Sequence, residues 1–161
     1  MEETLPVPRT PEEDDIIKIC AALNDRGALY LIVGGVAVNQ QGFLRATEDI
    51  DLLLEDSRQN QAKVLNALEI LPDKAVLQVE ESDLEQYTVV RVADEVVVDL
   101  MLSTCGIKYS EAVKEIEFKE IRGVRIPFAS AKLLLRMKQT YREKDIADRM
   151  FLQRKLEDNN S

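Results

Sequence analysis

The chain has 161 residues, of which 45% are hydrophobic and 32% are charged, and its formal net charge is −9. This length and balance predict one globular domain with its own core and exclude two ordinary domains. No apolar run approaches the ~20 residues that a membrane-spanning helix needs, and the acidic start is unlike a signal peptide. We therefore expect a cytoplasmic protein with no membrane contact.

The residue types present also limit the kind of site. The chain contains no histidine, and its two cysteines, Cys20 and Cys105, share no metal-binding spacing. Self-contained zinc fingers and histidine-based triads are therefore excluded, and any bound metal should prefer oxygen ligands. The two cysteines are interpreted as buried or half-buried free thiols of a reducing cytoplasm.

Periodicity predicts a single α/β (α+β) domain over residues 11–156, with a small mixed β-sheet flanked by helices. Residues 1–10 are expected to be a flexible tail and residues 157–161 a second tail. The expected helices are 10–27, 36–41, 57–70, 129–140 and 144–156. The expected strands are 29–33, 48–54, 75–79, 87–92, 95–102, 115–121 and 124–126, with Pro127 ending the last one.

The stretch from Tyr30 to Glu55 carries the clearest functional signal. One apolar run ends in Gly34-Gly35, and a second contains Asp49 and Asp51 separated by a single residue. Glycines ahead of a helix let backbone N–H groups approach a phosphate. Because strand side chains alternate, the two carboxylates share one face about 7 Å apart at Cα and could converge on divalent cations. Taken alone, each feature is more often structural.

A third carboxylate, Asp99, lies inside the apolar run VVVDLML. An unpaired buried charge would be costly there. Asp99 therefore either lies on a solvated face near the strand end or shares a metal site with the first two. Three carboxylates behind a glycine turn favour the metal site.

Positive charge gathers towards the C-terminus, where residues 132–155 include eight basic and three acidic residues. The negative charge of the whole chain argues against a general nucleic-acid-binding surface. The basic segment could place cations beside an anionic ligand, although a solvated helix face is the more common meaning of such a run.

The glycine pair, Asp49-Ile50-Asp51 and the later Asp99 resemble the signature of the nucleotidyltransferase superfamily, which has the DNA polymerase β-like fold. The segments VGGVAVNQQGFLRATEDIDLLL and IPFASAKLLLRMKQTYREKDIADRMFL resemble the minimal single-domain members that include the AbiEii-type toxins. The resemblance covers residues 29–54, 96–102 and 126–152. Many relatives have serine where this chain has Gly35, so one side-chain contact is missing.

The resemblance implies a role for each matching residue. Asp49, Asp51 and Asp99 would ligate two Mg²⁺ or Mn²⁺ ions, with Asp99 next to the hydroxyl that is activated. Gly34 and Gly35 would hold a nucleoside triphosphate through their backbone. The other positions implied to orient the site or contact phosphate are Arg45, Thr47, Lys138, Arg142, Lys144 and Asp145.

The implied activity is transfer of an NMP from an NTP to a hydroxyl acceptor, with release of pyrophosphate. RNA, protein and small molecules all remain possible acceptors, and a dimer or a protein partner could complete the cleft. The alternative is a non-catalytic nucleotide-binding or regulatory module of the toxin–antitoxin type, against which the three carboxylates count. Another two-metal activity, such as a phosphodiesterase, is a second alternative. Dinucleotide, P-loop and EF-hand sites lack their required spacing.

Overall fold

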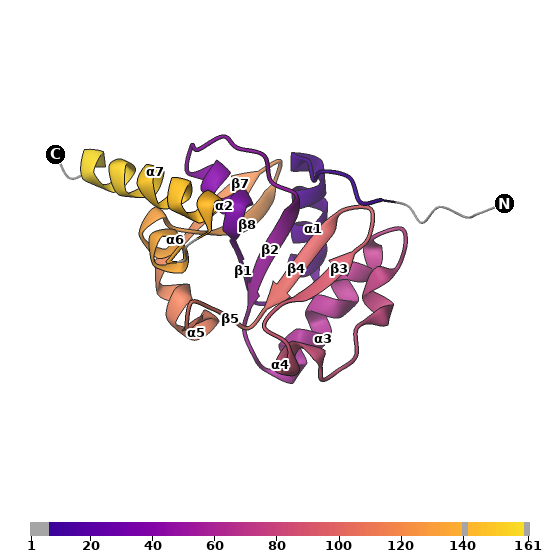
Figure 1. Cartoon of the computed structure of the whole chain (residues 1–161). Coiled ribbons are helices and arrows are strands. Elements are labelled where there is room, and N and C mark those ends of the chain that lie inside the picture. The colour runs from indigo at the N-terminus through magenta and orange to yellow at the C-terminus, as the bar shows by residue number, and fades with distance from the viewer. Residues whose placement is uncertain (1–6, 140–141, 160–161) are drawn as a thin grey trace.

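The computed structural model describes residues 7–139 and 142–159, and a six-stranded mixed sheet forms the centre of the molecule (Figure 1). Its strands are β1 (Tyr30–Val33), β2 (Asp49–Leu54), β3 (Val90–Ala93), β4 (Val97–Met101), β7 (Ile116–Ile121) and β8 (Val124–Ala129). They lie in the order β3-β4-β2-β1-β8-β7. The expected α/β architecture is therefore confirmed.

Helices cover this sheet on one face and along one side. The α-helices are α1 (Glu13–Asp25), α2 (Gly34–Gln40), α3 (Arg58–Ala67), α4 (Asp83–Gln86), α5 (Tyr109–Ala112), α6 (Ala131–Met137) and α7 (Glu143–Asn159). The 3₁₀ helices are η1 (Leu68–Ile70), η2 (Ala75–Gln78) and η3 (Val113–Glu115). In Figure 1, α1 and α3 lie behind the sheet, and α6 and α7 lie beside α2.

Strand β2 is the centre of the fold and fixes the register of its neighbours. It pairs antiparallel with β1 and parallel with β4, which places Asp51 directly opposite Asp99. Ile50 and the run Leu52–Leu54 are at most 1% exposed. The two aspartates of β2 therefore lie on a strand whose remaining side chains are buried in the core.

Helix boundaries follow the local chemistry of the sequence. The Ser57 side chain accepts a hydrogen bond from the Asn60 N–H at the start of α3, and Ser130 caps α6 through the Leu133 N–H. Gly27 follows α1 with a φ of 66°, in the left-handed region that ends many helices. The predicted helix ends at these positions are confirmed within a few residues.

The strand expected over residues 75–79 is wrong, because this segment forms the 3₁₀ helix η2. Lys74 enters the helix with a φ of 53°, and the buried carboxylate of Asp94 accepts the N–H groups of Asp73, Ala75 and Glu95. A side chain 20 residues away therefore holds the turn, and short-range periodicity does not report it.

Pro127 was expected to end a strand, but it lies inside β8 opposite Phe118. Proline can stand in a strand where the ladder does not need its nitrogen, and the pairing of β8 with β1 is confined to Ile32 opposite Phe128. Strand β3 begins at Val90, three residues later than expected, and α6 begins after Ala129. The expected end of this helix at residue 140 lies outside the described residues.

The chain ends also differ from the expected tails. Helix α7 continues to Asn159, beyond the predicted end at residue 156. Residues 7–10 form no regular structure, but the Arg9 guanidinium bonds Asp15 and Glu95. A short hairpin of β5 (Ser103–Thr104) and β6 (Ile107–Lys108) was not expected. Its turn residues, Cys105 and Gly106, both have positive φ, as a type I′ turn requires.

Both cysteines are free thiols, Cys20 buried in the core and Cys105 exposed. Within residues 7–139 and 142–159, no helix combines the length and the apolar character needed to cross a bilayer.

Candidate active site

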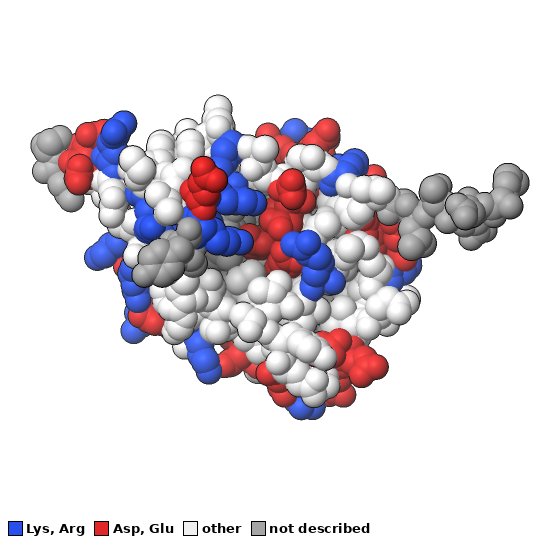
Figure 2. Space-filling view, in the orientation of Figure 1, with Lys and Arg blue, Asp and Glu red and all other residues white. Residues whose placement is uncertain are grey.

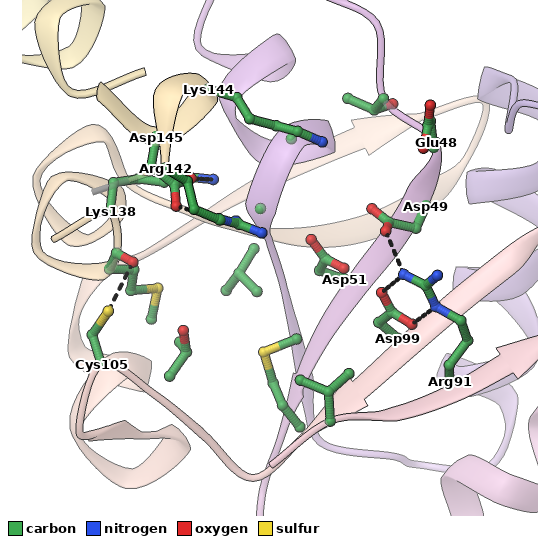
Figure 3. Close-up of a pocket in the computed structure, with 18 of the residues that line it drawn as sticks. Glu48, Asp49, Asp51, Arg91, Asp99, Cys105, Lys138, Arg142, Lys144 and Asp145 are labelled. Carbon is green, nitrogen blue, oxygen red and sulfur yellow. Dashed lines mark hydrogen bonds and ion pairs between the residues drawn. The ribbon is translucent and has the colours of Figure 1, made fainter. Parts of the chain in front are cut away.

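One cavity of about 550 Å³ is lined by every site residue that was predicted from the sequence (Figure 3). Its wall contains Gly34, Gly35, Arg45, Thr47, Asp49, Asp51, Asp99 and Lys138, together with Arg142, Lys144 and Asp145. Figure 2 shows acidic atoms in the middle of this face with basic side chains on both sides. Residues that lie far apart in the sequence thus meet at one opening.

The three carboxylates form a single cluster at the start of β2 and the middle of β4. One oxygen each from Asp49, Asp51 and Asp99 lie within 4.8 Å of one another. The parallel pairing of β2 with β4 creates this cluster, because it places Asp51 beside Asp99 while alternation along β2 keeps Asp49 on the same face. Such a set of oxygens suits a hard divalent cation.

Two carboxyl groups of the cluster, those of Asp49 and Asp51, have raised pKa values. Burial raises the pKa of the Asp51 carboxyl to about 7, and the charges of Asp49 and Asp99 add to that rise. Burial also raises the pKa of Asp49, again with help from Asp99, whereas Arg91 and Lys144 lower it. Without added positive charge, the ionised forms of Asp49 and Asp51 are therefore disfavoured.

The glycine pair is required by close packing against the site. A Cβ on Gly34, whose φ is 68°, would lie 1.9 Å from Asp51 Oδ2. A Cβ on Gly35 would lie 2.5 Å from the Thr47 methyl carbon and 3.1 Å from the Arg45 guanidinium. The backbone at the start of α2 therefore forms the cavity wall itself, because no side chain could stand between it and the carboxylate.

Arg45 connects the loop before β2 to helix α7. Its Nε and Nη2 donate to the two oxygens of Asp148 at 2.7 and 2.8 Å, and the Asp148 side chain is 0% exposed. Thr47, also buried, packs its methyl group towards Gly35. Both residues therefore support the cavity wall, and their main contacts are with protein groups.

Lys138 lies in the same buried network of charges. Its Nζ is 3.1 Å from Asp145 and 3.2 Å from Asp148, and the lysine side chain is 8% exposed. Arg142 donates to the second oxygen of Asp145 at 3.0 Å. In Figure 3 the side chains of Arg142 and Lys144 extend towards the carboxylates. The cationic side of the cavity is thus held by two buried aspartates on α7.

Comparison with known proteins identifies the fold. No family model and no curated protein sequence matches the chain. Among solved structures, the lincosamide antibiotic adenylyltransferase LnuA with bound lincomycin has a TM-score of 0.61 at 17% identity, over 90% of this chain and 98% of its own. ANT(2'')-Ia with adenylyl-2''-tobramycin has a TM-score of 0.57 at 18% identity, over 88% and 87% of the two chains.

A nucleotidyltransferase-like protein of Paracoccidioides brasiliensis also matches, with a TM-score of 0.52 at 19% identity over 89% of this chain and 78% of its own. The chain has the nucleotidyltransferase fold. LnuA is described as an adenylyltransferase and the fungal protein as nucleotidyltransferase-like, and each of the three structures is less than 25% identical to this chain. The comparison therefore supports the fold expected from the glycine pair and the carboxylates.

Two residues of this nucleotidyltransferase fold were missed by the sequence analysis. Arg91 on β3 hydrogen bonds both Asp49 and Asp99. The pairing of β3 with β4 in the folded protein creates this contact, because its register sets Arg91 opposite Asp99. Asp148 was missed as well, although it follows Asp145 by three residues on one face of α7 and both are buried.

The remaining wall of the cavity is mainly apolar. It contains Val33, Val89, Met101, Thr104, Cys105 and Met137, and among the described residues the exposed Glu48 is its one further charged residue. The Cys105 thiol donates to the carbonyl oxygen of Met137 at 3.1 Å, which ties the β5–β6 turn to the end of α6. The cavity thus has an anionic part, a cationic part and an apolar part.

Proposed function

We propose that this chain is a divalent-cation-dependent nucleotidyltransferase, which moves an NMP from an NTP to a hydroxyl acceptor and releases pyrophosphate. The observation that carries this proposal is the cluster of Asp49, Asp51 and Asp99 in a cavity whose opposite wall is cationic. The nucleotidyltransferase fold of the chain supports it.

The carboxylate cluster fits Mg²⁺ or Mn²⁺. One oxygen from each residue lies within 4.8 Å of the others, and the pKa values of Asp49 and Asp51 are raised by burial and by neighbouring negative charge, which a cation would offset. We assign Asp49, Asp51 and Asp99 as ligands of two such ions. When bound, the ions would lower the pKa of an acceptor hydroxyl and offset the charge of the triphosphate.

Backbone N–H groups and basic side chains of the cavity wall would hold the NTP. The backbone at Gly34 and Gly35 lies at the N-terminus of α2, where N–H groups favour phosphate. Arg142, Lys144 and the buried Lys138 supply positive charge on the other side. Arg45 and Thr47 pack against Gly35 and would fix the position of the glycine pair.

The transfer itself makes one bond and breaks one. The acceptor oxygen forms a bond to the α-phosphorus, and the bond between that phosphorus and the bridging oxygen of the β-phosphate breaks in line with it. The hydroxyl proton leaves towards the Asp99 side of the site, and the bonding electrons leave with pyrophosphate. Fixed cations beside the departing group stabilise its growing charge.

RNA, protein and small-molecule hydroxyls are the acceptor classes of this proposal. Two of the three similar structures are complexes with lincomycin and with adenylyl-2''-tobramycin, so antibiotics belong among the small molecules to test. We also propose a relationship to the AbiEii-type toxins, on the sequence segments that resemble them, and a cytoplasmic location, on the two free cysteines. We further propose that residues 11–156 act as one catalytic domain, which a second copy or a protein partner could complete.

A labelling assay tests the activity directly. The protein is incubated with each α-³²P-labelled NTP, Mg²⁺ or Mn²⁺, and separate pools of RNA, cell protein, aminoglycosides and lincosamides. We expect the label to pass to one pool with release of pyrophosphate. Asp49→Asn and Asp51→Asn should reduce transfer by about 10³-fold or more, which is what loss of a metal-held transition state costs. Asp56→Asn, an exposed position outside the cavity, is the control.

Two outcomes would overturn the enzymatic proposal. No transfer to any pool is the first, and undiminished transfer by the Asp49→Asn variant is the second. NTP binding without turnover would favour the alternative, in which the same fold acts as a nucleotide-binding or regulatory module.

A further inference from the structure

Arg91 lies on the edge strand β3, directly opposite Asp99 of β4. Its Nε donates to Asp99 Oδ1 and its Nη2 donates to Asp99 Oδ2, both at 2.9 Å. Nη2 also donates to Asp49 Oδ2 at 3.1 Å. A single guanidinium therefore bridges two of the three carboxylates, as Figure 3 shows.

A cation bound to this cluster would need an oxygen of Asp99, and Arg91 bonds both of them. Both oxygens of Asp99 and one oxygen of Asp49 accept from Arg91, and the three carboxylates converge within 4.8 Å. Asp99 has only 6% of its side chain exposed, whereas 59% of the Arg91 side chain is exposed. The guanidinium thus covers a buried anionic site from its solvent side, and it can leave without opening a void in the core.

We propose that Arg91 is an internal counter-ion of the carboxylate cluster, which occupies the place of a divalent cation and leaves that place when the cation binds. This inference rests on the proposed function, because it concerns the same three ligands. Charge repulsion gives the physical reason: a guanidinium in contact with Asp49 and Asp99 would lie within a few ångströms of the bound ions.

Arg91 is therefore a positioning residue that sets the affinity of the site for metal. Each binding event must break two charge-assisted bonds to Asp99 and one to Asp49, and such bonds are stronger than neutral ones. The opposite role, a permanent support that holds Asp99 in place for the metal, makes the opposite prediction. Removing a competitor tightens metal binding, whereas removing a support weakens it.

The chain offers a matched control for this test. Arg58 is also 59% exposed and also bonds two carboxylates, Glu81 and Glu85, but it does not line the cavity. Replacing either arginine by glutamine changes the net charge equally. A difference between the two variants therefore reports the local contact and not the overall charge of the molecule.

The experiment measures Mn²⁺ affinity from the electron paramagnetic resonance signal of the free ion, in the absence of nucleotide. We expect Arg91→Gln to lower the apparent dissociation constant at least about tenfold relative to wild type, the scale of one charge-assisted hydrogen bond. Arg58→Gln should leave it unchanged. In wild type, Mg²⁺ should also shift the ¹⁵N–¹H signal of the Arg91 Nε, which is assigned by its absence from Arg91→Gln.

Unchanged or weaker Mn²⁺ binding by folded Arg91→Gln would overturn the inference while leaving the metal site intact. Failure of both wild type and Arg91→Gln to bind Mn²⁺ would overturn the metal site of the proposed function and the inference with it. If circular dichroism shows that Arg91→Gln is unfolded, Arg91→Lys decides the matter, because it keeps the charge but loses the two-pronged geometry. It should bind Mn²⁺ more tightly than wild type, and equal affinity would count against the proposal.

Discussion

A Cβ atom on Gly34 would lie 1.9 Å from Oδ2 of Asp51, so the backbone of one residue and the carboxylate of the other share a space that admits no methyl group. This contact links the turn after β1 to the carboxylate cluster on β2. It also explains why a glycine stands at this position, independently of any ligand.

Gly34→Ala should therefore damage the metal site more than the fold. The φ of Gly34 is 68° and that of Gly27 is 66°, but a Cβ on Gly27 would meet nothing within 4 Å. Alanine at either position should cost about 1 kcal/mol of unfolding free energy because of backbone strain. Only Gly34→Ala must also displace Asp51, and we expect it to weaken Mn²⁺ binding about tenfold or more. Equal Mn²⁺ affinity of the two variants would refute this reading of the contact.

The raised pKa of Asp51 predicts a specific pH dependence of stability. Between its unfolded value of 3.8 and its folded value of about 7, the metal-free folded protein keeps a proton that the unfolded chain has lost. Asp51 therefore contributes its full stabilisation of the folded protein below pH 4, and this contribution to the free energy of unfolding is lost as the pH rises through 7. Denaturant unfolding in EDTA should show Asp51→Asn gaining stability relative to wild type over this range. Parallel pH profiles would contradict the prediction.

The ion pair between Arg45 and Asp148 should be strongly coupled. Asp148 is 0% exposed and also contacts Lys138, so Asp148→Asn leaves two cations with one carboxylate fewer. We expect a loss of about 3 kcal/mol in unfolding free energy, typical of breaking one side of a buried pair. Arg45→Met should also destabilise, and the double variant should lose clearly less than the sum of the two. Additive losses in a double-mutant cycle would show that the pair is not coupled.

Lys144 should act on the ligand and not on the fold. It is exposed, lines the cavity and lowers the pKa of Asp49. Lys144→Gln should weaken NTP binding about fivefold to tenfold, the scale of one lost phosphate contact, with an unchanged thermal midpoint. Lys132→Gln, at a position on α6 that is also exposed but lies outside the cavity, removes the same charge. Isothermal titration with a non-hydrolysable NTP compares them, and equal affinities would exclude a special role for Lys144.

The predictions from sequence were most accurate where local chemistry decides the structure. Alternation along β2 gave the shared face of Asp49 and Asp51, and the glycine pair gave the turn beside them. The helix capped by Ser57 was also predicted correctly. These features depend on neighbouring residues, so a single sequence contains them.

The features that were missed depend on contacts between distant residues. Asp94 holds the 3₁₀ turn at Ala75, Asp148 anchors Arg45 from 103 residues away, and Arg91 meets Asp99 only through strand pairing. Periodicity carries no information about such partners. All three missed contacts involve charged residues. From sequence alone a charged residue is expected to be exposed and solvated, and only the structure identifies its buried partner.

The central position of β2 has a consequence for how the protein is made. Asp51 and Asp99 become neighbours only when β2 and β4 pair, and 47 residues separate them along the chain. A nascent chain therefore possesses no cation site until both strands have left the ribosome and aligned in register. Metal affinity would then report completed folding, because a one-residue slip of either strand would turn its aspartates to the opposite face.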